Sequence, residues 1–274
     1  MRLEAVRASF EYRRGTPCLR RVSFAVSAGE VAFLLGANGS GKTTLLSCLA
    51  GMRRPTEGTI LLDGRALETF APRERAKQIG VVPQFYEPAW GFSVEETVAL
   101  GRAPYVGLFA RPGREDRLAV ERALDAVGLA RLRRRPTPRL SGGERQLVWI
   151  ARGIAQGAKC LLLDEPAAHL DPHHEQAVFA VVRRLAAEGA AFVVASHHPG
   201  SALLYGHTVT LLREGEVLNA GTPGEAMTEA SLYAVYGVDF TIVADRGGAR
   251  AIVPRLADVE AAPSTSRARG MEAG

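Results

Sequence analysis

The chain has 274 residues, of which 47% are hydrophobic and 23% charged, and it carries a formal net charge of +5. This length suffices for one large domain or two modest ones with a substantial core, and the composition is that of an ordinary globular protein. The sequence has no apolar run of about 18 residues or more and no signal-peptide segment at its start, so we expect neither a membrane span nor secretion.

Charge and cysteine content restrict the partners and the compartment. Much of the positive charge lies in short clusters such as residues 131–139, which are more typical of a solvated loop than of a binding surface. We therefore expect no nucleic-acid partner. The three cysteines, Cys18, Cys48 and Cys160, show no paired or metal-binding spacing, which predicts reduced thiols in a cytosolic protein.

The first third of the sequence predicts strands around one loop and one helix. Strands are expected over residues 3–12, 19–26 and 31–35, since apolar residues alternate in the first and run continuously in the third. A helix is expected over residues 45–50, ending at Gly51. Asp63-Gly64 after an apolar run predicts a hairpin turn, and a short strand over 79–83 precedes Gln84.

Residues 85–157 predict a block of helices inserted into this α/β pattern. Residues 93–96 have the form of a capping box and open a helix that runs to Gly101. Apolar residues at helical spacing predict a second helix over 115–127, and a third begins at about residue 140 and continues through Ile150.

The α/β pattern then resumes. It predicts strands over residues 160–164, 191–196, 208–213 and 216–220, with a helix over 174–187 and a short helix over 202–205. Residues 239–256 are expected to form a β-hairpin extension and residues 257–274 a disordered tail.

A glycine-rich loop lies between the strand over 31–35 and the helix that follows it. Strand, loop and helix in this order are the context of a phosphate-binding P-loop. Glycines let backbone N–H groups turn toward an anion, and the helix N-terminus adds its positive dipole end. The predicted phosphate-binding residues are Gly36, Ala37, Asn38, Gly39, Ser40, Gly41, Lys42, Thr43 and Thr44.

Two of these residues have specific expected roles. Lys42 should reach the β- and γ-phosphates of a nucleotide, and the Thr43 hydroxyl should bind Mg²⁺. By count, only Lys42, Lys77 and Lys159 among the 34 basic residues are lysines, so a lysine at this position indicates a need for a compact ammonium group.

Residues 161–165 carry a second nucleotide signal. An apolar strand ends in Asp164 and Glu165, which places both carboxylates at the edge of the sheet beside the phosphate loop. Asp164 is expected to bind Mg²⁺, directly or through water. Glu165 is expected to act as the base that polarises the attacking water.

Residues 140–146, LSGGERQ, resemble the LSGGQ signature of ABC ATPases, with Glu144 in place of the usual glutamine. Further motifs of that family match in order. Tyr12 resembles the aromatic residue that stacks on adenine, and Gln84 resembles the Q-loop glutamine. Residues 168–171 resemble the D-loop and His197 the switch histidine. The resemblance covers roughly residues 3–238.

The resemblance implies a fold and a mechanism. The fold class is α/β, a P-loop NTPase (RecA-like) core with an N-terminal antiparallel β subdomain and an inserted α-helical subdomain, over residues 1–238. Two subunits would form a head-to-tail homodimer with ATP and Mg²⁺ between Lys42 of one and Ser141, Gly142 and Gly143 of the other. Catalysis would use Glu165, His197 and Gln84, and the metal would be held by Thr43, Gln84 and Asp164.

Residues 100–105, LGRAPY, look like a segment of the ABC importers for iron-siderophore, haem and vitamin B12. That resemblance implies integral membrane permease subunits, a separate substrate-binding protein, and a bacterial subunit held peripherally on the cytoplasmic face of the inner membrane. An importer of molybdate or another metal is the alternative.

Two other classes of ABC ATPase remain open. One acts on nucleic acid or ribosomes and typically has a tandem repeat or a coiled-coil insertion, neither of which the sequence contains. The other is an exporter ATPase, which the importer-like LGRAPY segment disfavours. The neighbouring histidines His173-His174 and His197-His198 are more typical of solvated helix starts than of a metal site.

Overall fold

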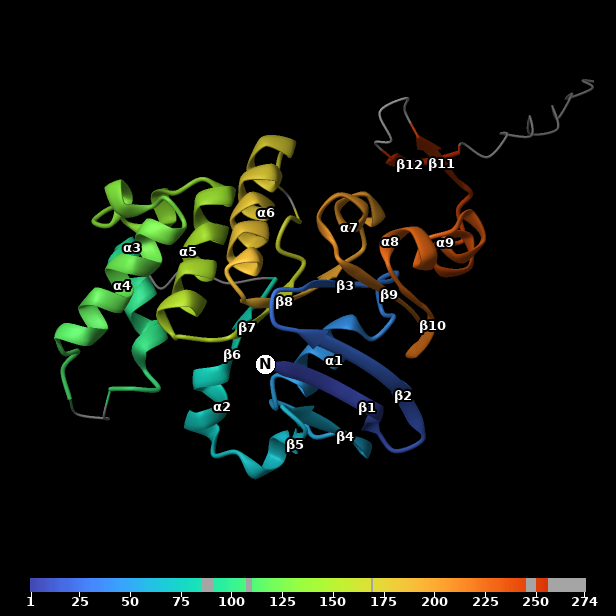
Figure 1. The fold of residues 1–274 in the computed structure, drawn as a ribbon, viewed down its shortest axis with the longest axis horizontal. Helices are drawn as coiled ribbons and strands as arrows, with labels where there is room; N and C mark the ends of the chain where they lie inside the picture. The colour runs from blue at the N-terminus through green and yellow to red at the C-terminus, as the bar shows by residue number, and fades with distance from the viewer. Residues whose placement is uncertain (85–90, 107–109, 169, 245–249, 256–274) are drawn as a thin grey trace, which may run out of the picture.

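The computed structural model describes residues 1–84, 91–106, 110–168, 170–244 and 250–255 (Figure 1). A six-stranded sheet lies at the centre, in the order β10-β9-β3-β8-β7-β6, and its strands are parallel except for β10, which is antiparallel to β9. The strands are β3 (Val31–Leu35), β6 (Ile79–Val82), β7 (Cys160–Asp164), β8 (Ala191–Ser196), β9 (Thr208–Arg213) and β10 (Glu216–Gly221).

Both faces of this sheet are covered, which explains why β3 is apolar at every position. Side chains alternate across a strand, so Val31, Phe33 and Leu35 belong to one hydrophobic cluster and Ala32 and Leu34 to the other. The first cluster includes residues of the helices α5 (Gly142–Ala155), α6 (Pro172–Ala187) and α7 (Pro199–Tyr205). The second includes residues of α1 (Lys42–Leu49) and of a second sheet.

The second sheet has four antiparallel strands in the order β2-β1-β4-β5 (Figure 1). They are β1 (Arg2–Arg13), β2 (Thr16–Ser27), β4 (Glu57–Leu62) and β5 (Arg65–Ala66). The predicted hairpin turn joins β4 to β5, with positive φ angles of 50° at Asp63 and 76° at Gly64. The antiparallel β region expected from the sequence is confirmed.

The helical block lies between β6 and β7 in the chain and to one side of the sheets (Figure 1). It contains α3 (Val94–Ala99), α4 (Arg114–Ala126) and α5, which pack on one another and, through α5, on α6. The predicted capping box opens α3: the Ser93 hydroxyl accepts from the Glu96 N–H, and the Glu96 carboxylate accepts from the Ser93 N–H.

Three helices were not expected from the sequence: α2 (Pro72–Gln78), α8 (Pro223–Ala226) and α9 (Glu229–Tyr236). All are short, so they carry little periodic signal. The expected C-terminal strands are present as β11 (Phe240–Ala244) and β12 (Arg250–Pro254), paired antiparallel, while their turn and the predicted tail lie outside the described residues. Within the described part of the chain, no helix is both long and apolar enough to cross a membrane.

Candidate nucleotide-binding site

The loop between β3 and α1 approaches its neighbours so closely that glycine is required at two positions. A Cβ on Gly36 would lie 2.4 Å from both the Leu212 carbonyl oxygen and the Ser40 hydroxyl oxygen. Gly41 has a φ of 105°, and a Cβ there would lie 2.9 Å from the Cys18 carbonyl oxygen. The loop is therefore held in one shape, with α1 beginning directly at its end.

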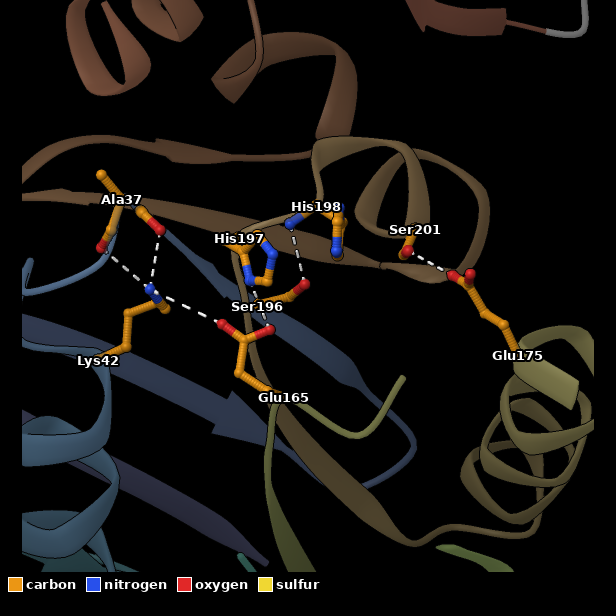
Figure 2. Close-up of polar contacts among 9 residues, drawn as sticks. Ala37, Lys42, Glu165, Glu175, Ser196, His197, His198 and Ser201 are labelled. Carbon is orange, nitrogen blue, oxygen red and sulfur yellow. Dashed lines mark hydrogen bonds and ion pairs between the residues drawn. The ribbon is translucent and has the colours of Figure 1, made fainter. Parts of the chain in front are cut away.

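Lys42 is folded back into this loop and buried (Figure 2). Its Nζ donates to the carbonyl oxygens of Gly36, at 2.8 Å, and Ala37, at 3.1 Å, and lies 3.9 Å from Glu165 Oε1. Burial lowers the pKa of Lys42, and the nearby carboxylates of Glu165 and Asp164 oppose that shift. The ammonium group is thus satisfied within the chain at the point where a phosphate would otherwise hold it.

Glu165 lies at the end of β7 in a strained backbone conformation. Its φ is 49°, a left-handed value that costs a residue with a Cβ about 1–2 kcal/mol. Its N–H donates to the Ala195 carbonyl, and its Oε2 lies 2.9 Å from His197 Nδ1 (Figure 2). Strain held by neighbouring strands is typical of functional positions, because the rest of the sheet must compensate for it.

Asp164 and Thr43 fit a divalent cation. Asp164 is buried, and its Oδ1 has no hydrogen-bond partner among the described residues. Burial raises the pKa of Asp164, and a hydrogen bond with the Thr43 side chain opposes this rise. A buried carboxylate oxygen without a donor, beside a hydroxyl oxygen, is the oxygen ligand set that Mg²⁺ prefers.

A cavity of about 460 Å³ opens beside the phosphate loop. Most of the predicted site residues line it: residues 38–44 of the loop, together with Gln84, Glu165 and His197. Gln84 reaches it from the end of β6, three strands of the sheet away from β3. The structure therefore brings together residues that are far apart in the sequence.

Two further lining residues were missed in the sequence. Cys18 lies on β2 with its Sγ 3.2 Å from Thr44 Oγ1, and the His198 ring contacts the His197 ring at a tilt of 41°, with centroids 3.9 Å apart. Burial and the neighbouring His197 lower the pKa of His198. Neither residue belongs to a motif, so only the packing of β2 and the turn after β8 reveals them.

Tyr12 is placed at the side of this cavity but does not line it. Its hydroxyl lies 3.1 Å from Thr44 Oγ1, and the Arg53 guanidinium lies 4.6 Å from the centre of its ring. Tyr12 as a whole residue is 56% exposed. Arg53 lies over the ring, and Phe10 packs edge-to-face with it, with ring centroids 5.1 Å apart.

The signature residues Ser141, Gly142 and Gly143 open α5 and do not line the cavity described above. Ser141 caps the helix: its hydroxyl accepts from the Glu144 N–H at 3.2 Å, and the Glu144 carboxylate accepts from the Ser141 N–H at 2.8 Å. Glu144 thus completes a capping box. The chain therefore has a phosphate loop at the start of α1 and, separate from it, the signature residues at the start of α5.

The fold and this site define a P-loop nucleotide-binding protein. Residues 19–168 match a family model whose description is "ABC transporter". The chain belongs to the ABC transporter family, as an ATP-binding subunit with ATPase activity. The resemblance noted in the sequence is confirmed.

Relatives and solved structures extend this result. The iron(3+)-hydroxamate import ATP-binding protein FhuC of Bacillus subtilis is 36% identical over 225 residues, which cover 82% of this chain and 84% of that protein. The hemin import ATP-binding protein HmuV of Nocardia farcinica is 41% identical over 218 residues, covering 80% and 75%.

Among solved structures, an inward-facing ABC transporter described as of the metal-chelate type superposes with a TM-score of 0.81 at 29% identity, covering 93% of this chain and 97% of that chain. A dimeric bacterial ABC transporter cassette superposes with a TM-score of 0.70 at 27% identity, covering 81% and 98%.

Proposed function

We propose that this chain is the ATP-hydrolysing subunit of a bacterial importer for an iron-siderophore, haem or cobalamin type of metal chelate. The arrangement of Lys42, Glu165 and His197 around one cavity carries the proposal for the chemistry. The similarity to proteins named for hydroxamate and hemin import, over about four-fifths of the chain, supports the transport role. The separate permease and substrate-binding protein belong to the proposal.

In this proposal ATP binding reorganises the contacts of Lys42. A γ-phosphate entering the cavity offers the ammonium group stronger acceptors than the Gly36 and Ala37 carbonyls, because its oxygens carry negative charge and the carbonyls are neutral. Lys42 then leaves Glu165. The carboxylate that it held at 3.9 Å becomes free to contact water.

Glu165 is then the base that orients and polarises the attacking water, and His197 holds the Glu165 carboxylate in place. The hydrogen bond to Glu165 uses His197 Nδ1, which leaves Nε2 for the phosphate or the water. Gln84 lines the same cavity from the opposite edge strand and contributes an amide to the metal or the water. A positioned base of this kind contributes about 10²–10⁴-fold to turnover.

Thr43 and Asp164, with Gln84, would hold Mg²⁺, which supplies charge neutralisation on the phosphates when it is bound. Burial of Asp164 keeps its oxygen away from competing solvent donors. The side chains of Thr43 and Asp164 are already in contact through the hydrogen bond that opposes the burial-induced rise in the pKa of Asp164.

The second half of the ATP site would come from another copy of the chain. Ser141, Gly142 and Gly143 offer N–H groups and a hydroxyl at a helix N-terminus, but none of them lines the cavity of its own chain. A head-to-tail homodimer places them on the ATP bound by the partner. The dimeric cassette that superposes on this chain supports such an arrangement.

The LGRAPY segment supports the importer assignment and has a structural role. Arg102 donates to Asp116 Oδ1 at 2.8 Å and to the Ala155 carbonyl at 2.7 Å, and its guanidinium lies 3.7 Å from the centre of the Tyr105 ring. A Cβ on Gly101 would lie 2.3 Å from the Arg152 carbonyl. These contacts fix the segment between α4 and α5, on the helical block that we propose contacts the permease at the cytoplasmic face of the membrane.

Reconstitution tests the proposal. The subunit is combined with the candidate permease and substrate-binding protein in lipid vesicles, and ATP hydrolysis is measured with and without ferric hydroxamate, haem or cobalamin. Stimulation by one of these chelates supports the assignment. Stimulation by molybdate instead, or tight salt-sensitive binding of nucleic acid without any effect of a permease, contradicts it in favour of the corresponding alternative.

A further inference from the structure

His174, near the start of α6, contacts the signature residues from within the same chain. Its Nε2 lies 3.4 Å from Ser141 Oγ, and its Nδ1 lies 2.7 Å from Asp171 Oδ2. Asp171 in turn caps α6 by accepting from the His174 N–H at 2.9 Å. The three side chains form a continuous chain of hydrogen bonds from the start of α6 to the start of α5.

The imidazole ring also packs on the backbone of the signature. A Cβ on Gly143 would lie 2.4 Å from His174 Cδ2 and 2.7 Å from its Cβ. The neighbouring Gly142 faces Leu170, whose Cδ2 would lie 3.1 Å from an added Cβ. The absence of a Cβ at Gly142 and Gly143 therefore allows Leu170 and His174 to approach the signature backbone closely.

The hydrogen-bond directions follow from the chemistry of Asp171. The hydrogen bonds that it accepts from the backbone N–H and side chain of His174 lower the pKa of Asp171, so the carboxylate is ionised and can only accept. His174 Nδ1 is then the protonated nitrogen. In the neutral ring Nε2 is the acceptor, and the Ser141 hydroxyl donates to it while accepting from the Glu144 N–H.

We propose that His174, oriented by Asp171, is a positioning residue for Ser141, and that closure of the ATP-bound dimer depends on it while ATP binding by a single subunit does not. The inference rests on the proposed function, because it gives Ser141 its role on the partner's ATP. His174 holds the Ser141 hydroxyl in one rotamer and fixes the start of α5 against the start of α6.

In the proposed dimer, the contact between His174 and Ser141 also links the two ATP sites. Asp171 follows Glu165 after a short segment in which the Ala168 N–H donates to the Glu165 carbonyl and the Leu170 N–H to the Ala167 carbonyl. Ser141, which would touch the partner's ATP, is therefore connected through His174 to the segment that begins at this chain's own catalytic carboxylate.

The test measures ATP-driven dimerisation by analytical ultracentrifugation, with full-length chains that carry Glu165→Gln to stop turnover. His174→Ala is expected to raise the ATP concentration for half-dimerisation about five- to tenfold, since it removes one hydrogen bond and the packing on Gly143. Binding of a fluorescent ATP analogue at protein concentrations that keep the chain monomeric should not change. Gln176→Ala is the matched control, because Gln176 is exposed on the same helix.

Conservative variants separate positioning from general stability. His174→Gln keeps an acceptor for the Ser141 hydroxyl and should restore most of the dimerisation, whereas His174→Asn keeps only the bond to Asp171 and should not. In a Ser141→Ala background, His174→Ala should add little. Equal dimerisation of His174→Ala and the parent overturns the inference, as does a matching loss of monomer ATP binding. If Ser141→Ala itself has no effect, the proposed trans site fails instead.

Discussion

The phosphate-loop region and the signature region both contain a helix N-terminus that we propose binds phosphate, but the contacts that hold them differ. Lys42, Asp164 and Glu165 are buried, and Lys42 Nζ lies 3.9 Å from Glu165 Oε1. Ser141 and Gly142 lie at the edge of the helical block, held by capping contacts and by residues of the neighbouring helix. The first region is organised by the fold of the sheet, the second by polar contacts between two helix ends.

This difference separates the two kinds of effect that a substitution can have. In the phosphate-loop region a change removes a buried charge and acts on ATP binding or on the chemical step. In the signature region a change alters a partly exposed helix end and should act on how two subunits come together. If variants in both regions changed ATP binding and subunit association alike, the two regions would work as one unit within a single chain.

The largest effect is expected for Lys42→Ala. It removes the ammonium group that would bind the phosphates and leaves Glu165 and Asp164 without a neighbouring positive charge. ATP binding by the monomer should weaken about 100-fold or more, and ATP-driven dimerisation should be lost with it. Calorimetric titration with ATP measures the first and ultracentrifugation the second. Lys159→Ala, at an exposed lysine, is the control.

Glu165→Gln should leave ATP binding intact and lower turnover by about 10²–10⁴-fold, because the amide cannot accept a proton from the attacking water. Steady-state release of phosphate measures turnover, and the calorimetric titration measures binding. Glu188→Gln, at an exposed carboxylate after α6, controls for the loss of a negative charge. Near-normal hydrolysis by Glu165→Gln would falsify the assignment of the base.

Much of the phosphate-loop region could be predicted, because local patterns specify it. The continuous apolar run over Val31–Leu35, the glycines after it and the carboxylates at the end of β7 each have a short-range signature. The positive φ of Glu165 and the folded-back position of Lys42 could not be predicted. Both arise from strands β3, β7 and β8, which pair across long sequence separations.

The signature region was predictable as a motif but not as a contact. The capping box at Ser141 can be recognised in the sequence, since it needs only residues three positions apart. The approach of His174 to Gly143 depends on how α5 packs on α6, which local spacing does not determine. Short helices such as α9 were missed for a similar reason: tertiary packing stabilises them more than their own periodicity does.

A smaller effect, on stability, is expected at the LGRAPY segment. Asp116→Asn weakens the charge-assisted hydrogen bond from Arg102, whose side chain is 11% exposed, and should lower the free energy of unfolding by about 1.5–3 kcal/mol at pH 7. The hydrogen bond from Arg102 lowers the pKa of Asp116 in the folded state. The stabilisation by this hydrogen bond is therefore complete above the pKa of Asp116 in the unfolded chain, about 3.9. It is lost as the pH falls through the lower pKa of Asp116 in the folded protein.

Urea unfolding of the parent and of Asp116→Asn between pH 7 and pH 3 measures this prediction. The difference in unfolding free energy should stay constant down to about pH 4 and shrink below it. Asp125→Asn, on an exposed face of the same helix α4, is the matched control. A difference that instead grew as the pH fell would contradict the ion pair as its source.

The smallest effect is expected for Glu144→Gln, which restores the residue that the family usually has in the signature. The amide oxygen can still accept from the Ser141 N–H, but the negative charge near the helix N-terminus is lost, which should cost about 0.3–1 kcal/mol of stability. The same charge repels a phosphate approaching Ser141, so ATP-driven dimerisation should become tighter although the subunit becomes less stable. Thermal unfolding and ultracentrifugation measure the two quantities on the same samples. Opposite signs support an anion site at the start of α5, whereas parallel losses would mean that this helix end serves only the fold of its own chain.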